Sequence, residues 1–411
     1  MPKLLQINAT CTFGSTGMIA SQIGNLARAR GWDTYIAYGR NDHVSDAHTL
    51  QIGSIANLAE HFVETRLLDN HGFASRIATY RFLKKVERIR PDIVHLHNIH
   101  GYYINVQMLM EHLAKNDIPT VWTFHDCWAF TGHCAHYDAI GCTKWQDHCF
   151  ECPQKKAYPT SFRDNSYNNY ERKRRLFNLP RDLTIVPVSY WMGRQVRQSF
   201  LKDRKIKVIQ NGIDLSVFHP MTSCSDANIK ERVKGKFVIL GVSSIWFHGD
   251  WKGYDDFLKL SEMIDDDTRI VMVGVNKKQL KELPDNIIGI CRLANKEELA
   301  EIYSLADVFF NPTNSDNFPT TNLEVLACGT PVITYRTGGS VEAIDENTGI
   351  IVNKGDISGA LKAINGIKNG TIAFSPDSCR QRAVKNFDKN ERFLDYISLY
   401  EEILGNAPKR P

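Results

Sequence analysis

ADVFFNPTNSDNFPTTNLEVLACGTPVITYRTGG, residues Ala306–Gly339, is the stretch that decides the fold. It begins with a short apolar run, continues through a polar loop that holds Asp316, and then becomes helical near Thr320, with Glu324 following. A second apolar run occupies residues 331–335. Strand, loop, helix and strand in this order predict a parallel sheet with its binding loops after the strands. The amides at the start of the helix are suited to hold a phosphate, although acids near a helix start also serve as ordinary caps.

The same alternation extends from this stretch to both ends of the chain and falls into two series. Strand-like runs of the first series lie at 3–7, 34–38, 92–96, 120–124 and 183–188, and those of the second at 236–242, 269–273, 287–291, 307–311, 331–335 and 349–352. Segments with helical spacing separate them. We therefore expect an α/β chain of two Rossmann-like, doubly wound domains that face each other across a cleft. They would span residues 1–205 and 206–387, with a last helix in 388–411 that packs back on the first.

Composition narrows the class of protein. The chain has 411 residues, 43% of them hydrophobic, which excludes a disordered or collagen-like chain. It has no apolar run near the roughly 18 residues of a membrane span and no signal-peptide pattern at its start, so we expect a cytoplasmic location. Basic residues outnumber acidic ones 14 to 4 between Lys155 and Lys207. This excess indicates either a solvated helix face or contact with a diphosphate-bearing substrate or an anionic membrane surface. No nucleic-acid-binding motif accompanies it.

A family resemblance adds to these patterns. Asp316, Glu324 eight residues later, and the run ACGTPV at 327–332 resemble the signature of retaining glycosyltransferases of family 4, where the first acid is usually Glu. The runs VIQNGID at 208–214 and TGGSVE at 337–342 resemble further motifs of that family. The sequence Asp-Asn-Phe-Pro, which begins at Asp316, resembles that of a subgroup found in exopolysaccharide clusters, including the colanic-acid type. The resemblance implies the GT-B fold, a nucleotide-sugar donor such as a UDP- or GDP-sugar, and catalysis without a metal.

The resemblance also assigns donor-binding residues in the second half of the chain. Lys252, in a Trp-Lys-Gly run, matches a family Lys that contacts the donor diphosphate, although a surface lysine at a helix start would look the same. Relatives commonly place an Arg where this chain has Phe247, so another cation such as Arg292 would have to contribute. Glu324 would bind the ribose. The turn between the acids would hold the phosphates, through Asn317, Phe318, Pro319, Thr320 and Thr321.

In the first half, the resemblance points to a glycine loop and a histidine. Gly14 and Gly17 follow the first strand, where glycine lets the backbone approach a phosphate or an acceptor closely. His125 ends a predicted strand and matches a family histidine that faces the donor sugar, while a purely structural histidine remains the alternative. We name His125, Asp316 and Lys252 as the candidate catalytic residues. The nearby His95, His97 and His100 are expected to pack or to contact the acceptor.

Four cysteines lie within nineteen residues, in an expected insertion at 133–153. Their spacing and the closing Cys-x-x-Cys-Pro are typical of tetrahedral zinc, whereas free thiols and disulfides are the other possibilities. We expect a structural zinc ion held by Cys134, Cys142, Cys149 and Cys152. The exopolysaccharide subgroup that the chain resembles has a similar Cys-rich insertion.

Together these features predict a retaining, hexosyltransferase-type glycosyltransferase in bacterial surface polysaccharide biosynthesis. The expected acceptor is a saccharide carried on a lipid diphosphate, reached from the inner face of the membrane. A nucleotide-sugar epimerase is one alternative, and it would need no acceptor. A zinc-stabilised carbohydrate-binding protein is another, and it would bind glycans without a nucleotide.

Overall fold

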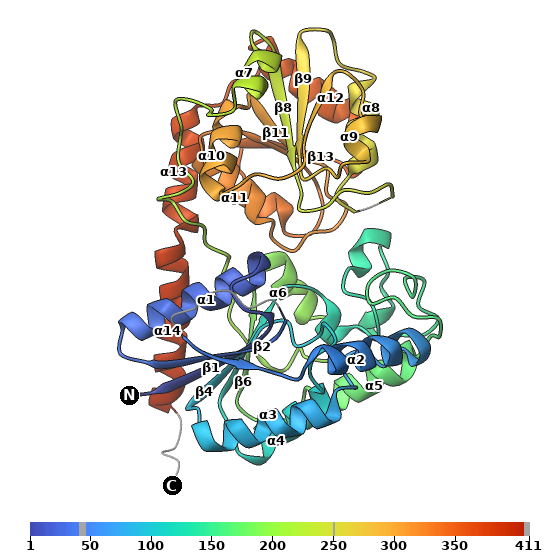
Figure 1. Ribbon diagram of the computed structural model, residues 1–411, viewed down its shortest axis with the longest axis vertical. Helices are drawn as coiled ribbons and strands as arrows, with labels where there is room; N and C mark the ends of the chain where they lie inside the picture. Colours follow the sequence, from blue (N-terminus) through green and yellow to red (C-terminus); the bar gives the residue numbers. More distant parts are fainter. Residues whose placement is uncertain (41–46, 250, 407–411) are drawn as a thin grey trace. The chain divides into compact units, whose positions relative to one another are not determined.

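The computed structural model describes residues 1–40, 47–249 and 251–406. The chain forms two compact units, one made of Met1–Gln210 with Phe393–Pro411 and the other of Asn211–Arg392. Each unit contains one sheet, and every strand pair in both sheets is parallel (Figure 1). The predicted α/β class with two parallel sheets is therefore confirmed.

The sheet of the first unit has the order β3-β2-β1-β4-β5-β6-β7. Its strands are β1 Lys3–Thr10, β2 Asp33–Arg40, β3 His48–Gln51, β4 Ile93–Leu96, β5 Thr120–Phe124, β6 Leu183–Pro187 and β7 Lys205–Ile206. The edge strands β3 and β7 were not predicted, because β7 has only two residues and β3 is polar and largely exposed. The strand order reverses direction between β1 and β4, which is the position where doubly wound sheets bind their ligands.

Helices cover both faces of this first sheet. The helices that contribute to this unit are α1 Gly14–Ala29, α2 Ile55–Leu68, α3 Arg76–Ile89, α4 Val106–Lys115, α5 Ser166–Leu176, α6 Tyr190–Val196 and α14 Lys389–Asn406. One face packs on the apolar sides of α1 and α14, and the other on those of α3, α4 and α5. The end of the expected range 388–411 lies outside the described residues, but α14 belongs to the first unit from Phe393 on.

The second sheet repeats the topology of the first, with the order β10-β9-β8-β11-β12-β13. Its strands are β8 Phe237–Val242, β9 Thr268–Val273, β10 Ile287–Ile290, β11 Val308–Asn311, β12 Val332–Tyr335 and β13 Gly349–Val352. Four-residue apolar runs such as VITY in β12 are fully buried, as expected for central strands covered on both faces. The reversal point of this sheet lies between β8 and β11.

The helices of the second unit are α7 Ala227–Val233, α8 Tyr254–Ser261, α9 Gln279–Glu282, α10 Lys296–Leu305, α11 Thr320–Ala327, α12 Ile357–Lys368 and α13 Pro376–Phe387. Figure 1 shows α10, α11 and α13 on one side of the sheet and α8, α9 and α12 on the other. Within the ranges that the structure describes, no helix combines the length and the apolar character that a membrane crossing requires.

Candidate functional site

The reversal point of the second sheet brings two of the predicted site residues together. Lys252 lies in the loop after β8 and Asp316 in the loop after β11, and their Nζ and Oδ2 atoms form an ion pair at 2.6 Å. The Lys252 side chain is 34% exposed and that of Asp316 is 17% exposed. Both charges are thus accessible to a ligand that arrives at the carboxyl ends of these strands.

The loop that carries Lys252 is fixed to the loop after β11 by its backbone. The carbonyl of Trp251 accepts hydrogen bonds from the Asn314 amide at 2.6 Å and from the Thr313 hydroxyl at 3.2 Å. Gly253 has φ of +84°, and a Cβ there would lie 2.6 Å from the Pro312 carbonyl oxygen. The glycine of the Trp-Lys-Gly run therefore allows the close approach that positions the lysine.

Asp316 is held in turn by the loop after β12. The Gly339 amide donates to the Asp316 carbonyl at 3.0 Å, and the Phe318 amide donates to Asp316 Oδ1 at 3.2 Å. Gly338 has φ of +50°, and a Cβ at this position would collide with the Asp316 carbonyl oxygen. The loop that resembled the family's Gly-Gly motif therefore serves to shape the acidic loop.

Helix α11 begins directly after this acidic loop. Pro319 precedes its first turn, in which Thr320 and Thr321 stand, and Asn317 and Phe318 are buried beneath them. Because the first amides of a helix have no partner within the helix and lie at its positive end, this turn can bind an anionic group. The predicted phosphate-binding residues thus form one continuous segment next to Lys252.

Glu324 lies one turn further along α11 and has a partner that the sequence did not reveal. The Tyr303 hydroxyl, from α10, donates to Glu324 Oε2 at 2.9 Å. Burial raises the pKa of Glu324 above its usual value, and the hydrogen bond from Tyr303 counteracts this. The buried tyrosine fixes one carboxylate oxygen, and the Thr320 side chain in the first turn of α11 also hydrogen-bonds the Glu324 carboxylate. The only sequence signal was an aromatic residue on the apolar side of α10.

Arg292 follows the edge strand β10, whereas Lys252 and Asp316 follow the two strands at the reversal point. Arg292 is exposed in the loop after β10, and β10 is the edge strand two places away from β8. A different cation contacts the acidic loop, because Lys354 Nζ donates to the Asn314 carbonyl at 3.1 Å. Lys354 lies two residues after the end of β13 and was not predicted. Its position at a strand's carboxyl end was the available signal.

The reversal point of the first sheet is occupied by a chain of histidines. His97 comes just after β4. Its Nδ1 lies 3.1 Å from His125 Nε2, and its Nε2 lies 3.0 Å from Gln6 Oε1 on β1. The amide nitrogen of Gln6 donates to the Ala20 carbonyl at 2.7 Å, which fixes Oε1 as the acceptor facing His97. His97 therefore carries its proton on Nε2, and His125 must donate through its own Nε2.

This arrangement sets the chemistry of His125. Burial lowers its pKa to about 4, and burial lowers the pKa of His95 and His97 well below the usual value. The imidazole is thus neutral at pH 7, with the proton on Nε2 and a lone pair on Nδ1. His125 is suited to accept a hydrogen bond from a sugar hydroxyl rather than to supply a positive charge.

The two predicted glycines differ in their surroundings. Gly14 is exposed and is the first residue of α1. Gly17 is buried against β1, where a Cβ would lie 2.8 Å from Thr10 Oγ1, so its visible role is close helix–strand packing. Asn8 joins this loop to the histidines, because it bonds Thr16 Oγ1 at 3.4 Å and accepts from the Asn98 amide at 3.2 Å. The glycine loop and His97 thus meet at the same edge of the sheet.

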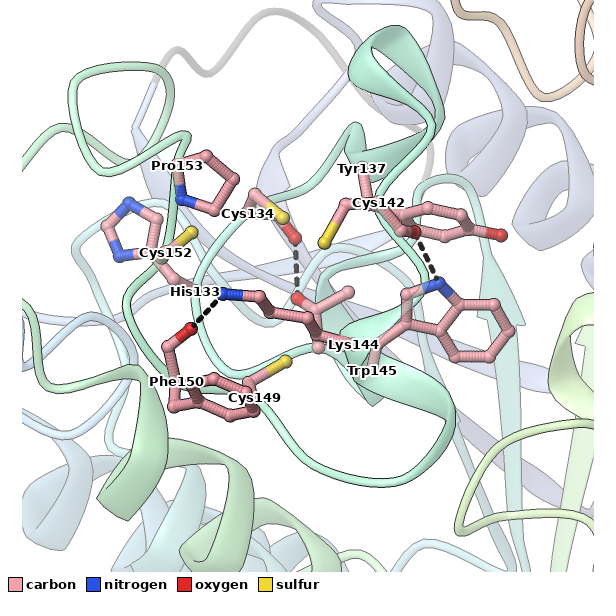
Figure 2. Close-up of a pocket in the computed structure, with 11 residues that line it drawn as sticks. His133, Cys134, Tyr137, Cys142, Lys144, Trp145, Cys149, Phe150, Cys152 and Pro153 are labelled. Carbon is pink, nitrogen blue, oxygen red and sulfur yellow. Dashed lines mark hydrogen bonds between the residues drawn. The ribbon is translucent and has the colours of Figure 1, made fainter.

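The four predicted metal ligands surround one pocket of the first unit. Figure 2 shows Cys134, Cys142, Cys149 and Cys152 around it. A hydrogen bond from the Cys134 thiol to the Cys152 sulfur lowers the pKa of Cys152 to about 7. All four are free thiols. In the part of the chain that the structure describes, no three His, Cys, Asp or Glu side chains are gathered closely enough to hold a metal ion.

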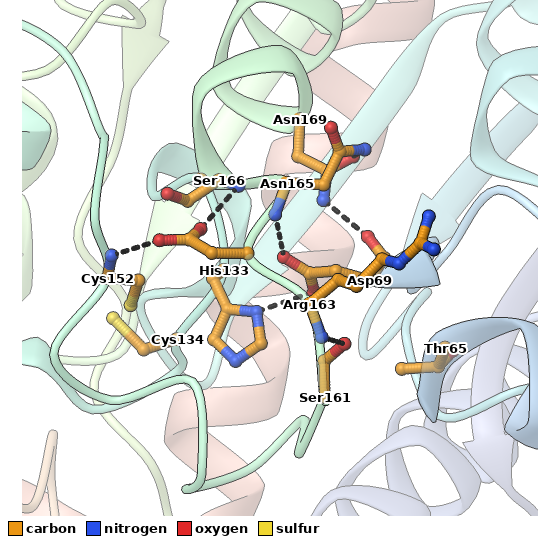
Figure 3. A network of polar contacts seen from close by, with 12 residues as sticks. Thr65, Asp69, His133, Cys134, Cys152, Ser161, Arg163, Asn165, Ser166 and Asn169 are labelled. Carbon is orange, nitrogen blue, oxygen red and sulfur yellow. Dashed lines mark hydrogen bonds and ion pairs between the residues drawn. The ribbon is translucent and has the colours of Figure 1, made fainter. Parts of the chain in front are cut away.

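A buried histidine adds a further donor to this pocket. His133 bonds through Nδ1 to Asp69 Oδ1 at 2.6 Å, while its buried Nε2 has no hydrogen-bond partner (Figure 3). Asp69 Oδ2 in turn accepts from the Asn165 amide at 2.9 Å. Lys173 is buried nearby, where it donates to the Trp128 and Thr131 carbonyls at 2.7 and 3.0 Å. Burial lowers its pKa to about 7, whereas Cys149 raises it.

The basic run at 172–175 is only partly available to a partner. Lys173 is buried, and the guanidinium of Arg172 lies 3.6 Å from the centre of the Phe73 ring. Arg174 and Arg175 are exposed, but Arg174 is paired with Glu171 at 2.7 Å. Two of the four charges are therefore used within the fold.

Comparison with known families divides the chain close to the boundary between its two units at Gln210. The family described as Glycosyltransferase Family 4 matches residues 18–217, and the family described as Glycosyl transferases group 1 matches residues 226–386. The second match contains Lys252, Asp316 and Glu324, and the first contains His125. The candidate residues thus fall within the two matched regions, except for Gly14 and Gly17, which lie just before the first match.

Individual relatives agree with this assignment. The colanic acid biosynthesis glycosyl transferase WcaC of Escherichia coli is 21% identical over 98% of this chain and 100% of its own. The N,N'-diacetylbacillosaminyl-diphospho-undecaprenol alpha-1,3-N-acetylgalactosaminyltransferase of Campylobacter jejuni is 25% identical over 52% of this chain and 58% of its own. The crystal structure of Anabaena HepE in complex with UDP covers 98% of this chain and 100% of its own, with a TM-score of 0.67 at 14% identity, and supports the GT-B fold. The chain is therefore a glycosyltransferase of group 1 type, with a family 4 domain in its first half.

Proposed function

We propose that this protein is a retaining, hexosyltransferase-type glycosyltransferase of bacterial surface polysaccharide biosynthesis, with a UDP- or GDP-sugar as donor. The observation that carries the proposal is the Lys252–Asp316 ion pair at the reversal point of the second sheet, beside the start of α11. The similarity to WcaC, which is named for colanic acid biosynthesis, supports the biosynthetic setting, and the UDP bound to HepE supports the class of donor.

On this proposal the donor diphosphate competes with Asp316 for Lys252. The ammonium group would stabilise the negative charge that develops as the nucleoside diphosphate leaves, together with the first amides of α11 at Thr320 and Thr321. Glu324, fixed by Tyr303, would accept hydrogen bonds from the ribose hydroxyls. Lys354 is a better-placed second cation than Arg292, because it already donates a hydrogen bond to Asn314 in the acidic loop. These protein groups would let catalysis proceed without a metal ion.

The transferred sugar would keep its anomeric configuration. Departure of the diphosphate and attack by the acceptor hydroxyl would take place on the same face of the sugar, and the leaving phosphate would take the proton. Asp316, once released by Lys252, would orient the sugar. We assign His125 to the same sugar, because it directly follows β5 at the carboxyl edge of the first sheet and its ring is neutral. Neither residue has to act as a strong base.

We propose a saccharide on a lipid diphosphate as the acceptor. The Campylobacter relative is named for a substrate in which a sugar is linked to undecaprenol through a diphosphate. An enzyme with such an acceptor would work as a peripheral protein at the anionic inner face of the membrane. The run at 172–175 contributes at most two exposed charges to such binding, whereas Arg194, Lys202 and Lys207 of the same basic stretch are also exposed.

We also propose that Cys134, Cys142, Cys149 and Cys152 hold a structural zinc ion. Four thiols line one pocket, although they would have to draw closer together around the ion than they lie in the structure. The buried Nε2 of His133 in that pocket lacks a partner, and thiolates would balance the buried charge of Lys173. Bound zinc would add to the folding free energy of the insertion. Metal analysis of protein purified without chelator should find about one zinc per chain, and a chelator should lower the unfolding temperature. Protein that is stable and free of zinc would refute this.

The test of the function is an assay of transfer with defined products. UDP- and GDP-hexoses are incubated with the protein and a lipid-diphosphate saccharide, and the new linkage is examined by NMR. An α-linked product from an α-linked donor supports a retaining transferase. An inverted linkage would refute retention, a donor epimer formed without acceptor would indicate an epimerase, and glycan binding without any turnover would indicate a binding protein.

A further inference from the structure

Helix α2 exposes an apolar side to solvent, whereas an ordinary surface helix buries that side. The side chains that it directs to solvent are mostly apolar: Ile55 is 83% exposed, Phe62 42%, Val63 50% and Leu67 52%. At 100° per residue these positions, with the exposed Ala56 and Ala59 between them, fall on one side of the helix. Arg66 is the one charged residue within that arc.

The buried side of α2 is polar. His61 and Thr65 are fully buried there, and His61 bonds Ser75 Oγ through Nδ1 at 2.8 Å and accepts from the Gly72 amide through Nε2 at 3.0 Å. Thr65 donates to the His61 carbonyl at 2.8 Å. Leu58 is the apolar residue of α2 that packs against the core of the first unit, whereas Ile55, Phe62, Val63 and Leu67 stay largely exposed. Water-exposed apolar arcs of this size mark surfaces that bind a partner.

Helix α3, which starts beside α2, adds further exposed apolar residues and positive charge. Its first turn lies against α2, because Ser75 bonds His61 and Ala78 lies beside Gly53. Ile77 and Tyr80 are 64% and 56% exposed. We define the α2–α3 surface by the exposed apolar residues Ile55, Phe62, Val63, Leu67, Ile77 and Tyr80.

Basic residues dominate around this surface. The two helices carry six basic residues against three acidic ones, and the basic set is Arg66, Arg76, Arg81, Lys84, Lys85 and Arg88. Of the acidic residues, Glu64 accepts from Asn70 at 2.6 Å and Glu87 is paired with Lys84 at 2.8 Å. Glu60 is the third. The guanidinium of Arg66 lies 4.9 Å from the centre of the Phe62 ring, which keeps a charge within the apolar arc.

We propose that the α2–α3 surface docks the protein on an anionic lipid bilayer. The apolar arc of α2 would enter the boundary between headgroups and acyl chains, and the basic residues of α3 would contact the phosphate headgroups. A second copy of the chain is a poorer occupant, because a twofold contact would place the same basic residues opposite each other. A bilayer supplies apolar area and negative charge at once.

This inference supplies the surface that the proposed lipid-linked acceptor requires, but its test needs neither donor nor acceptor. The full-length protein is sedimented with vesicles of phosphatidylcholine, with and without phosphatidylglycerol. We expect binding to the anionic vesicles that weakens with salt. The Phe62→Ser/Leu67→Ser pair should weaken it at least about tenfold, because two apolar side chains lose their burial in lipid. Arg81→Glu/Lys85→Glu should do the same at low salt.

The matched control is Met263→Ser/Leu280→Ser in the second unit, where both side chains are 44% exposed. It should bind vesicles like the unaltered protein. The unfolding temperature of each variant is measured as well, so that a loss of binding is distinguished from a loss of the contact between Phe62 and the Tyr102 ring. No binding to anionic vesicles, or unchanged binding of both α2–α3 variants, would overturn the proposal. So would a dimer seen by analytical ultracentrifugation that the Phe62→Ser/Leu67→Ser pair abolishes without any vesicle binding. Transfer to a water-soluble acceptor measures the proposed function separately.

Discussion

The ion pair between Lys252 and Asp316 allows binding and turnover to be separated by two single substitutions. In the proposed reaction Lys252 holds the diphosphate throughout and most strongly as it leaves, whereas Asp316 competes for Lys252 before the donor binds. Removing the lysine should therefore weaken nucleotide binding and turnover together. Removing the charge of the aspartate should impair turnover while nucleotide binding is kept or improved.

The exposure and the position of the ion pair determine how much each substitution should change the stability and the turnover. Both side chains are partly exposed, at 34% and 17%, so the 2.6 Å contact should add at most about 1 kcal/mol to stability. Lys252→Met should thus lower the unfolding temperature by only a few degrees. Loss of one preorganised donor to a developing negative charge typically lowers kcat about 100- to 1,000-fold. The effect on catalysis should therefore far exceed the effect on the fold.

The assay combines calorimetric binding of UDP and GDP with kcat and KM for transfer. We expect Lys252→Met to lose most nucleotide affinity and most turnover, and Asp316→Asn to bind the nucleotide at least as tightly while kcat falls. Lys259→Met is the matched control, since Lys259 is a lysine of the same unit, 64% exposed, with a distant partner at 3.8 Å. Near-normal turnover in Lys252→Met, or equal loss of nucleotide affinity in both site variants, would refute the reasoning.

Three further predictions concern the support of the site and its pH dependence. Gly338→Ala should disturb the acidic loop and lower kcat/KM at least about tenfold, because a Cβ there collides with the loop backbone; a crystal structure with an unmoved loop would contradict this. Tyr303→Phe should remove the Tyr303 hydrogen bond to the Glu324 carboxylate and raise KM for the nucleotide-sugar several-fold with a smaller change in kcat, measured against donor concentration. Because burial keeps His97 and His125 neutral in the fold, the unfolded chain takes up their protons first as the pH falls below about 6.5. The free energy of unfolding of the first unit should therefore decrease between about pH 6.5 and 4, by up to about 1.4 kcal/mol per pH unit for each histidine, and denaturant titrations at several pH values would show it; a flat profile would contradict the buried neutral histidines.

The sequence predicted most of both sheets because their central strands are continuous apolar runs with glycine-bearing loops between them. It also predicted the acidic loop and the start of α11, since both lie within one short segment. The edge strands β3 and β7 were not predicted, because both are short and β3 is largely exposed. Periodicity identifies strands that are buried on both faces and is weak at the edges of a sheet.

Contacts between distant segments could not be predicted in the same way. Tyr303 lies 21 residues before Glu324 and Gln6 lies 91 before His97, so only the fold reveals that each pair is bonded. The excess of basic residues indicated either a solvated helix face or contact with an anionic partner, but Lys173 of the run at 172–175 is buried within the fold. The exposed apolar side of α2 was not predicted either, since only the fold shows that His61 and Thr65 face inward.

The most direct test of the central claim is whether the isolated protein binds a nucleoside diphosphate through the predicted residues. The unfolding temperature is measured with UDP, GDP, ADP, dTDP and CMP at saturating concentrations, for the unaltered protein and for Glu324→Ala. A ligand at about 100 times its Kd adds about 2.7 kcal/mol, which shifts the melt by several degrees. We predict a shift with UDP or GDP that Glu324→Ala abolishes. Unchanged melting with every nucleotide, or an equal shift in Glu324→Ala, would contradict a nucleotide-sugar site at the start of α11.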